Sequence, residues 1–173
     1  AVKTDKDGNL YNDASLNHLN AVVPGSTVKG AMVYLGLSEG KMSPTEQISD
    51  APIKIAGTPE KSSSQNLVST NSITALAQSS NVYMFHVAMR IADANYGYNR
   101  PLYGIDQSDF IKMKNNFAKF GLGVETGIDV PNEEIGYIGK SFQGGFLLDY
   151  AIGQYDSYTP MQLSNYINTI AND

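Results

Sequence analysis

The chain has 173 residues, of which 42% are hydrophobic and 17% charged, a balance typical of a globular protein with a buried core. Its formal net charge of −5, with only 12 Lys and Arg residues scattered along the sequence, argues against a nucleic-acid-binding surface. The absence of cysteine excludes disulfides, thiolate catalysis and zinc–thiolate sites.

The first part of the chain predicts a hairpin or loop, a buried helix and a long irregular stretch. Residues 3–20 are polar and rich in Asn, Asp and Gly, which indicates a loop or short hairpin. After an extended VVPG approach, residues 26–37 predict a helix with Ser26 at its start. This helix is apolar on almost every face, so we expect it to be buried. Residues 38–71 are interrupted by prolines and form an irregular stretch with a short strand near 52–55.

The second part predicts a second buried helix and a series of loops and helices around it. A helical region begins near Ser72, pauses at 79–81 and resumes at 82–92, again apolar nearly all round. We expect this helix to pack on the helix at 26–37, with little sheet in the fold. A Tyr- and Gly-rich loop follows at 93–106. The remaining helices are predicted at 107–120, 142–152 and 160–171.

No segment of the sequence indicates a membrane span, a targeting signal or a metal site. No apolar run approaches the roughly 20 residues that are needed to cross a bilayer, and the start AVKTDKDGNL is unlike a signal peptide. We therefore expect any anchor of the protein to lie outside this chain. His18 and His86 stand alone without an HExxH-type partner. We predict neither a metal nor a cofactor.

The first candidate for chemistry is the tetrapeptide Ser26-Thr27-Val28-Lys29. Residues i and i+3 of a helix lie on one face, so Ser26 and Lys29 can meet. A serine hydroxyl needs a neighbouring base to become a good nucleophile, and a lysine can be that base when burial lowers its pKa. Free backbone N–H groups at a helix N-terminus can stabilise an oxyanion.

Spacing alone does not identify this site, since Ser38-Glu39-Gly40-Lys41 matches the same S-x-x-K pattern. There a glycine interrupts the helix and no apolar run follows, so we interpret the second match as a surface loop.

The second candidate is the S-x-N tripeptide Ser79-Ser80-Asn81, which lies between two apolar helical runs. A serine and an amide on such a turn can share a proton with Lys29 and hydrogen-bond a substrate amide. The alternative is an ordinary helix-capping cluster. The same pattern recurs in polar, loop-like sequence at 15–17, 64–66 and 69–71. Only the copy at 79–81 has a predicted core helix on both sides, as fixed catalytic geometry requires.

Four segments in the same order resemble the penicillin-binding transpeptidases. VVPGSTVKGA resembles the nucleophile segment of that family, and ALAQSSNVYMF is similar to its second motif. FGLGVETGIDVPNE resembles the family's TG-I-D-x-P loop, and AIGQYDSYTPMQLSNYINTIAN resembles its GQ…TPxQL…IAN segment. The similarity runs from about residue 20 to the end and is greatest to the class B, monofunctional type of Gram-positive bacteria.

The resemblance implies a fold, a reaction and a set of roles. The fold is mainly α (α+β), the helical lobe of a penicillin-binding transpeptidase or serine β-lactamase-like fold with most of the central sheet missing. Ser26 would be the acyl acceptor and Lys29 its base. Ser79 would relay a proton to the leaving amine, and Asn81 would contact Lys29 and the amide of the substrate.

The resemblance also implies partners and a location. The substrates would be peptidoglycan stem peptides ending in D-Ala-D-Ala, and β-lactam antibiotics would acylate the same serine. Cell-division or elongation proteins are further expected partners, and nucleic acid is not. The site would act at the extracytoplasmic face of the bacterial cell membrane.

One departure from the family pattern concerns its third motif, Lys-Thr-Gly or Lys-Ser-Gly on an edge strand. The nearest string, Lys140-Ser141-Phe142, lacks the glycine and precedes the GQ segment, whereas the motif would follow it. We therefore expect residues 1–173 to be a fragment of the transpeptidase domain. A β-lactam sensor domain, a serine β-lactamase and an inactive structural fragment remain alternatives. Glu125 and Glu133 lie in a loop that transpeptidases share, so neither identifies the deacylating base of a β-lactamase.

Overall fold

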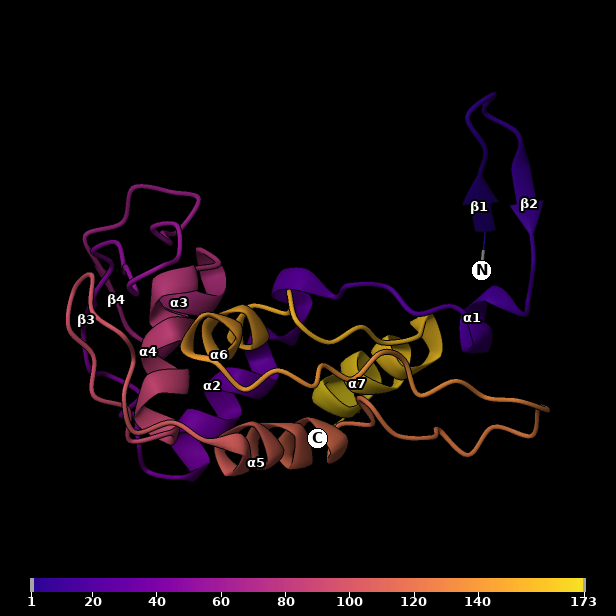
Figure 1. Cartoon of the computed structure of the whole chain (residues 1–173). Helices are drawn as coiled ribbons and strands as arrows, with labels where there is room; N and C mark the ends of the chain where they lie inside the picture. The colour runs from indigo at the N-terminus through magenta and orange to yellow at the C-terminus, as the bar shows by residue number, and fades with distance from the viewer. Residues whose placement is uncertain (1, 173) are drawn as a thin grey trace.

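A computed structural model describes residues 2–172 of the chain. Its core is built on two helices, α2 (Lys29–Ser38) and α4 (Asn81–Ile91), which pack on each other, and α6 (Gly144–Ala151) packs on α4 (Figure 1). Both central helices are apolar on more than one face, which is why they occupy the interior. The fully buried residues of α4 are Val82, Tyr83, Met84, Phe85, Val87 and Ala88.

Four further helices complete the described part of the chain. α3 (Ser72–Ala77), α5 (Gln107–Ala118) and α7 (Pro160–Asn172) lie around this core, whereas α1 (Leu16–Leu19) lies away from it and contacts α7. Two of them begin with a capping box, in which the N-cap side chain accepts backbone N–H groups and a side chain three residues on accepts the N-cap N–H. Asn71 has this role for α3 and Asp106 for α5.

The strands are short and lie at the margins. β1 (Val2–Thr4) pairs antiparallel with β2 (Leu10–Asn12), and Figure 1 shows this hairpin next to α1 and apart from the helical core. β3 (Ile48–Ser49) pairs antiparallel with β4 (Ser69–Thr70) beside α4. The segment 52–55 forms only isolated bridges, from Ile53 and Ile55.

The predicted fold class, mainly α with little sheet, is confirmed, and the predicted packing of the two apolar helices on each other is observed. The single helix predicted at 26–37 is wrong in detail. A 3₁₀ turn, η1 (Gly25–Val28), comes first, and α2 begins only at Lys29. The expected burial on almost every face fails at Tyr34, which is 50% exposed. Within residues 2–172, no helix is long and apolar enough to cross a membrane.

Candidate active site

Ser26 lies in the η1 turn and is exposed to solvent. The backbone on its N-terminal side is held by the segment that follows α6. Val22 and Tyr158 exchange both backbone hydrogen bonds, at 2.8 and 2.9 Å, and the Gly25 N–H donates to the Gly153 carbonyl at 2.9 Å. These pairings position the turn that presents the Ser26 hydroxyl.

The contact between Gly25 and Gly153 requires glycine. A Cβ on Gly153 would lie 2.3 Å from the Gly25 carbonyl oxygen, far inside van der Waals contact. The φ of Gly153 is +70°, a left-handed conformation that side chains with a Cβ rarely adopt. Two backbones can therefore touch directly beside Ser26.

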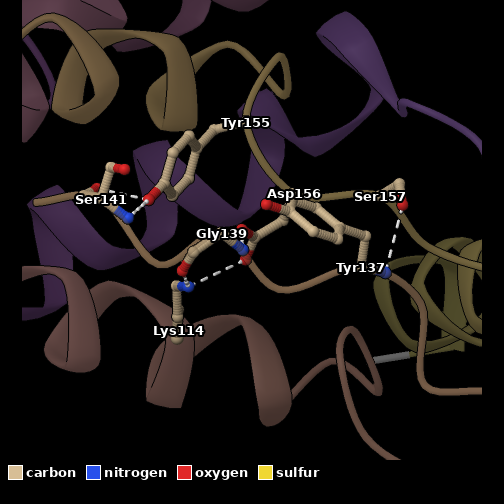
Figure 2. Close-up of polar contacts among 7 residues, drawn as sticks. All are labelled: Lys114, Tyr137, Gly139, Ser141, Tyr155, Asp156 and Ser157. Carbon is tan, nitrogen blue, oxygen red and sulfur yellow. Dashed lines mark hydrogen bonds and ion pairs between the residues drawn. The ribbon is translucent and has the colours of Figure 1, made fainter.

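The segment 153–158 is fixed in turn by a polar cluster (Figure 2). Asp156, 3% exposed, accepts the Gly139 N–H at 2.8 Å, while Lys114 from α5 donates to the Gly139 carbonyl at 2.8 Å and lies 3.5 Å from the second Asp156 oxygen. The Tyr155 hydroxyl bonds the backbone of Ser141. Burial raises the pKa of Asp156. The Gly139 N–H and the charge of Lys114 lower this pKa and so oppose the effect of burial. The cluster thus holds residues 137–141 against residues 153–158, the segment that supports the turn at Ser26.

Lys29, the first residue of α2, points its ammonium group into a cluster of acceptors. It is 2% exposed, and its Nζ lies 2.7 Å from the Ser79 carbonyl oxygen, 3.0 Å from Ser79 Oγ and 2.7 Å from Asn81 Oδ1. An ammonium group has three N–H donors, and each finds an acceptor here. The charged form of the lysine is therefore fully hydrogen-bonded.

Burial nevertheless disfavours that charge. Desolvation lowers the pKa of Lys29 from 10.5 to about 8, and the negative charge of Asp50 opposes the shift. Near neutral pH about a tenth of the molecules would carry the neutral amine, which can accept a proton. Lys29 thus has the electrostatics of a general base.

Ser79 connects α3 to α4 in an unusual backbone conformation. Its φ is +53°, the left-handed region, which costs a residue with a Cβ about 1 kcal/mol. This conformation accompanies the placement of both its carbonyl and its hydroxyl at Lys29. The hydroxyl accepts from the ammonium form of Lys29 and can donate to the neutral amine, so it can follow a proton transfer.

Asn81 begins α4 and completes the cluster. Its Oδ1 accepts from Lys29, and its Nδ2 donates to the Ser62 carbonyl at 3.0 Å. One Nδ2 hydrogen remains after this bond, which leaves the amide able to donate to a second acceptor.

The structure brings three of the four predicted residues into hydrogen-bonded contact: Lys29, Ser79 and Asn81. Within the described residues, no hydrogen bond joins the Ser26 side chain to these three groups. Residues i and i+3 of a 3₁₀ turn lie on the same side, however, and the Lys29 N–H bonds the Ser26 carbonyl across η1. The pattern can thus combine a hydroxyl nucleophile, a base and a second hydroxyl.

Sequence reasoning missed the residues behind the cluster. Asp50 is 7% exposed and accepts the hydroxyls of Ser63 and Ser80. Asp50 and Ser63 lie in the irregular stretch 38–71, where no periodicity distinguishes one polar residue from another. The only available signal was that Ser80 belongs to the S-x-N tripeptide.

The chain matches a known protein family and several known proteins. The family described as penicillin binding protein transpeptidase domain matches residues 1–173. Penicillin-binding protein 2A of Bacillus subtilis is 43% identical over 173 residues, covering 99% of this chain, and penicillin-binding protein H of the same organism is 47% identical over 149 residues, covering 86%. The chain spans 24% and 21% of the length of these two relatives.

A solved structure of penicillin-binding protein 2B from Streptococcus pneumoniae superimposes with a TM-score of 0.88 at 34% identity, covering 99% of this chain and 29% of that chain. A complex between PBP2 and MreC from Helicobacter pylori, at 22% identity and a TM-score of 0.73, covers 90% of this chain and 28% of that chain and shares the fold. The family match over the whole chain and these relatives lead to one conclusion: the chain belongs to the penicillin-binding protein transpeptidase domain family.

Proposed function

We propose that residues 1–173 are part of a peptidoglycan D,D-transpeptidase domain in which Ser26 becomes acylated. The observation that supports this most is the contact of Lys29 with both Ser79 and Asn81, at 2.7–3.0 Å, in a chain that matches the transpeptidase family from end to end. A buried lysine with a pKa of about 8 is suited to activating a serine.

In the first half-reaction the neutral Lys29 takes the proton of Ser26 as its oxygen attacks the penultimate D-Ala carbonyl of a stem peptide. A C–O bond forms to Ser26 and the peptide C–N bond breaks. The departing D-Ala amine takes up the proton through Ser79, which lies 3.0 Å from Lys29. Asn81 donates its remaining amide hydrogen to the substrate amide.

In the second half-reaction an amine of a neighbouring stem peptide attacks the ester. A new peptide bond forms, the C–O bond to Ser26 breaks and the serine regains its proton. A β-lactam follows only the first half, because the nitrogen released by ring opening stays attached to the acyl group. The whole drug therefore remains bound to the protein.

The same proposal gives a location and partners. The stem peptides place the site at the extracytoplasmic face of the bacterial membrane, with an anchor elsewhere in the protein. The fold shared with a PBP2 solved in complex with MreC supports elongation or division proteins as partners.

Intact mass after incubation with a penicillin tests the proposal. We expect a gain equal to the whole drug in the wild-type chain and none in Ser26→Ala. Ser38→Ala is the matched control, because Ser38 begins the other S-x-x-K string but lies at the exposed end of α2. This variant should acylate like the wild type.

The other outcomes identify a serine β-lactamase or an inactive fragment. Rapid return to the unmodified mass, with hydrolysed drug in solution, indicates a serine β-lactamase. An acyl-enzyme on Ser38, or none even in a longer protein that carries the third motif, contradicts the proposal. Acylation only in that longer protein identifies this chain by itself as an inactive structural fragment.

A further inference from the structure

A buried carboxylate, that of Asp50, lies next to the first turn of α4, the turn that carries Asn81. Asp50 follows β3, and its Oδ1 accepts the Ser80 hydroxyl at 2.5 Å and the Ser63 hydroxyl at 3.0 Å. A carboxylate that is 7% exposed is costly unless hydrogen bonds compensate for lost water. Both compensating bonds come from hydroxyls that also contact α4.

The first of these hydroxyls caps the helix. Ser80 is fully buried, and its Oγ accepts the Tyr83 N–H at 2.9 Å. The first N–H groups of a helix have no partner within the helix, so this bond satisfies one of them. Because the oxygen is used as an acceptor, the single hydroxyl hydrogen is free to point at Asp50.

The second hydroxyl reaches the same turn from a different segment. Ser63 Oγ accepts the Asn81 N–H at 3.0 Å and the Val82 N–H at 3.3 Å. Its hydrogen likewise goes to Asp50, 3.0 Å away, in preference to Ser80 Oγ at 3.4 Å. One carboxylate oxygen thus orients two hydroxyls, which together hold three N–H groups of α4.

The residue fixed by this arrangement is Asn81, whose side chain receives Lys29. We propose that Asp50 is a positioning residue of this site: it holds the first turn of α4 through Ser63 and Ser80, and its negative charge acts on Lys29. The inference rests on the proposed function in so far as Lys29 serves as the base. Asp50 itself does not touch the reacting atoms.

The electrostatic part has a definite sign. A negative charge near an ammonium group favours the charged form, and Asp50 raises the pKa of Lys29 against the larger lowering by burial. Asp50 also acts on His86 of α4: burial and Arg90 lower the pKa of His86, and the charge of Asp50 raises it. Lys61, close to Ser63 in the chain, is paired with Asp149 instead.

The Asp50→Asn variant separates charge from shape, because an amide oxygen can still accept the hydroxyls of Ser63 and Ser80. We expect the Lys29 titration midpoint to move to lower pH. The midpoint is measured by NMR on protein labelled with ¹³C at the lysine Cε, and Lys29→Arg assigns the signal. The matched control is Asp106→Asn, which removes the charge of an aspartate at the start of a different helix, α5. A merely structural role predicts no shift in either variant.

Acylation kinetics give the second readout. The rate of penicillin acylation against pH should show its acidic limb at lower pH in Asp50→Asn than in the wild type and Asp106→Asn. In Asp50→Ala, which also loses the acceptor oxygen, the rate should fall on the order of a hundred-fold at every pH, as expected for a misplaced base.

The titration tests the inference about Asp50, and acylation tests the proposed function, so each can be contradicted without the other. The titration needs no reactive serine, so an unshifted Lys29 midpoint in Asp50→Asn overturns this inference whatever the acylation result. A shifted midpoint in a protein that never acylates supports the coupling of Asp50 to Lys29 and contradicts the proposed function. If the acidic limb of the acylation rate against pH moves as far in Asp106→Asn as in Asp50→Asn, the specific role of Asp50 is overturned.

Discussion

Lys29 can be fully hydrogen-bonded in both of its protonation states, but the neutral state requires the Ser79 hydroxyl to reorient. As an ammonium it donates to the Ser79 carbonyl, the Ser79 hydroxyl and Asn81. After losing a proton it has two donors and one lone pair, and a carbonyl oxygen cannot donate to that lone pair. Ser79 Oγ can, by rotating its hydrogen. The site therefore couples the charge of Lys29 to the orientation of one hydroxyl.

The left-handed backbone at Ser79 gives a prediction that separates stability from chemistry. Ser79→Gly and Ser79→Ala both remove the hydroxyl, so we expect both to lower the penicillin acylation rate on the order of a hundred-fold. Glycine tolerates the φ of +53°, so Ser79→Gly should be more stable than Ser79→Ala by about 1 kcal/mol in urea unfolding.

Equal stabilities of the two Ser79 variants would show that the backbone relaxes once the hydroxyl is gone. The wild type is the reference for both measurements. Unequal acylation rates would mean that backbone strain, and not only the hydroxyl, contributes to the reaction.

At the scale of single residues, the sequence predicted part of the observed contacts: Lys29 meets Ser79 and Asn81, whereas no hydrogen bond within the described residues joins the Ser26 side chain to them. The S-x-x-K and S-x-N patterns placed Lys29 with Ser79 and Asn81, as the structure has them. Neither the 3₁₀ turn at Ser26 nor the left-handed Ser79 follows from local pattern, because both depend on contacts with distant segments. Asp50 could not be identified at all, since its role depends on burial.

At the scale of elements, α7 supports the start of α2. The Tyr166 hydroxyl accepts the Ala31 N–H at 3.2 Å, one of the N–H groups that the first turn of a helix leaves unpaired. A Cβ on Gly30 would lie 2.7 Å from that hydroxyl, so the two helices approach closely here. The N-terminal turn of α2, which Lys29 begins, is thus capped by a side chain of α7.

Removing that cap should cost stability. We expect Tyr166→Phe to lower the free energy of unfolding by about 1–2 kcal/mol, because the buried Ala31 N–H loses its acceptor. Urea unfolding measures the change. Tyr34→Phe is the control, since Tyr34 lies on α2, the helix that Tyr166 caps, but is itself 50% exposed. Equal losses in both variants would contradict the capping role.

The helices themselves were largely predictable, because their apolar runs and capping residues are local features. The helix predicted at 107–120 is observed as Gln107–Ala118, and that at 160–171 as Pro160–Asn172. The observed helix boundaries differ from the predicted ones where contacts with distant segments determine where a helix begins. The helix predicted at 142–152 begins only at Gly144, where an added Cβ would meet Leu102 at 2.8 Å.

At the scale of the whole molecule, the buried lysine makes stability depend on pH. The pKa of Lys29 is about 8 when folded and 10.5 when exposed. Between these values the unfolded chain holds a proton that the folded chain has released, so the free energy of unfolding rises with pH. Below pH 8 both states are protonated and this contribution is flat.

We therefore expect stability to increase by about 2 kcal/mol from pH about 7 to about 9.5, measured by urea unfolding. Above that range the buried tyrosines, whose pKa values burial raises, act in the opposite direction. Lys29→Met should remove the increase, and Lys41→Met, which alters an exposed ion pair, should retain it. A wild type whose stability is flat or falls over this range contradicts the lowered pKa.

The direct backbone contact between Gly25 and Gly153 also bears on the order of folding. It joins segments near opposite ends of the chain, and such contacts form late because a long loop must first be closed. The α2–α4 core can assemble before α6 and the following residues 153–158 have docked onto it. A partly folded chain would then possess a hydrophobic core but no ordered turn at Ser26, so reactivity with a penicillin would report the completion of folding and not its onset.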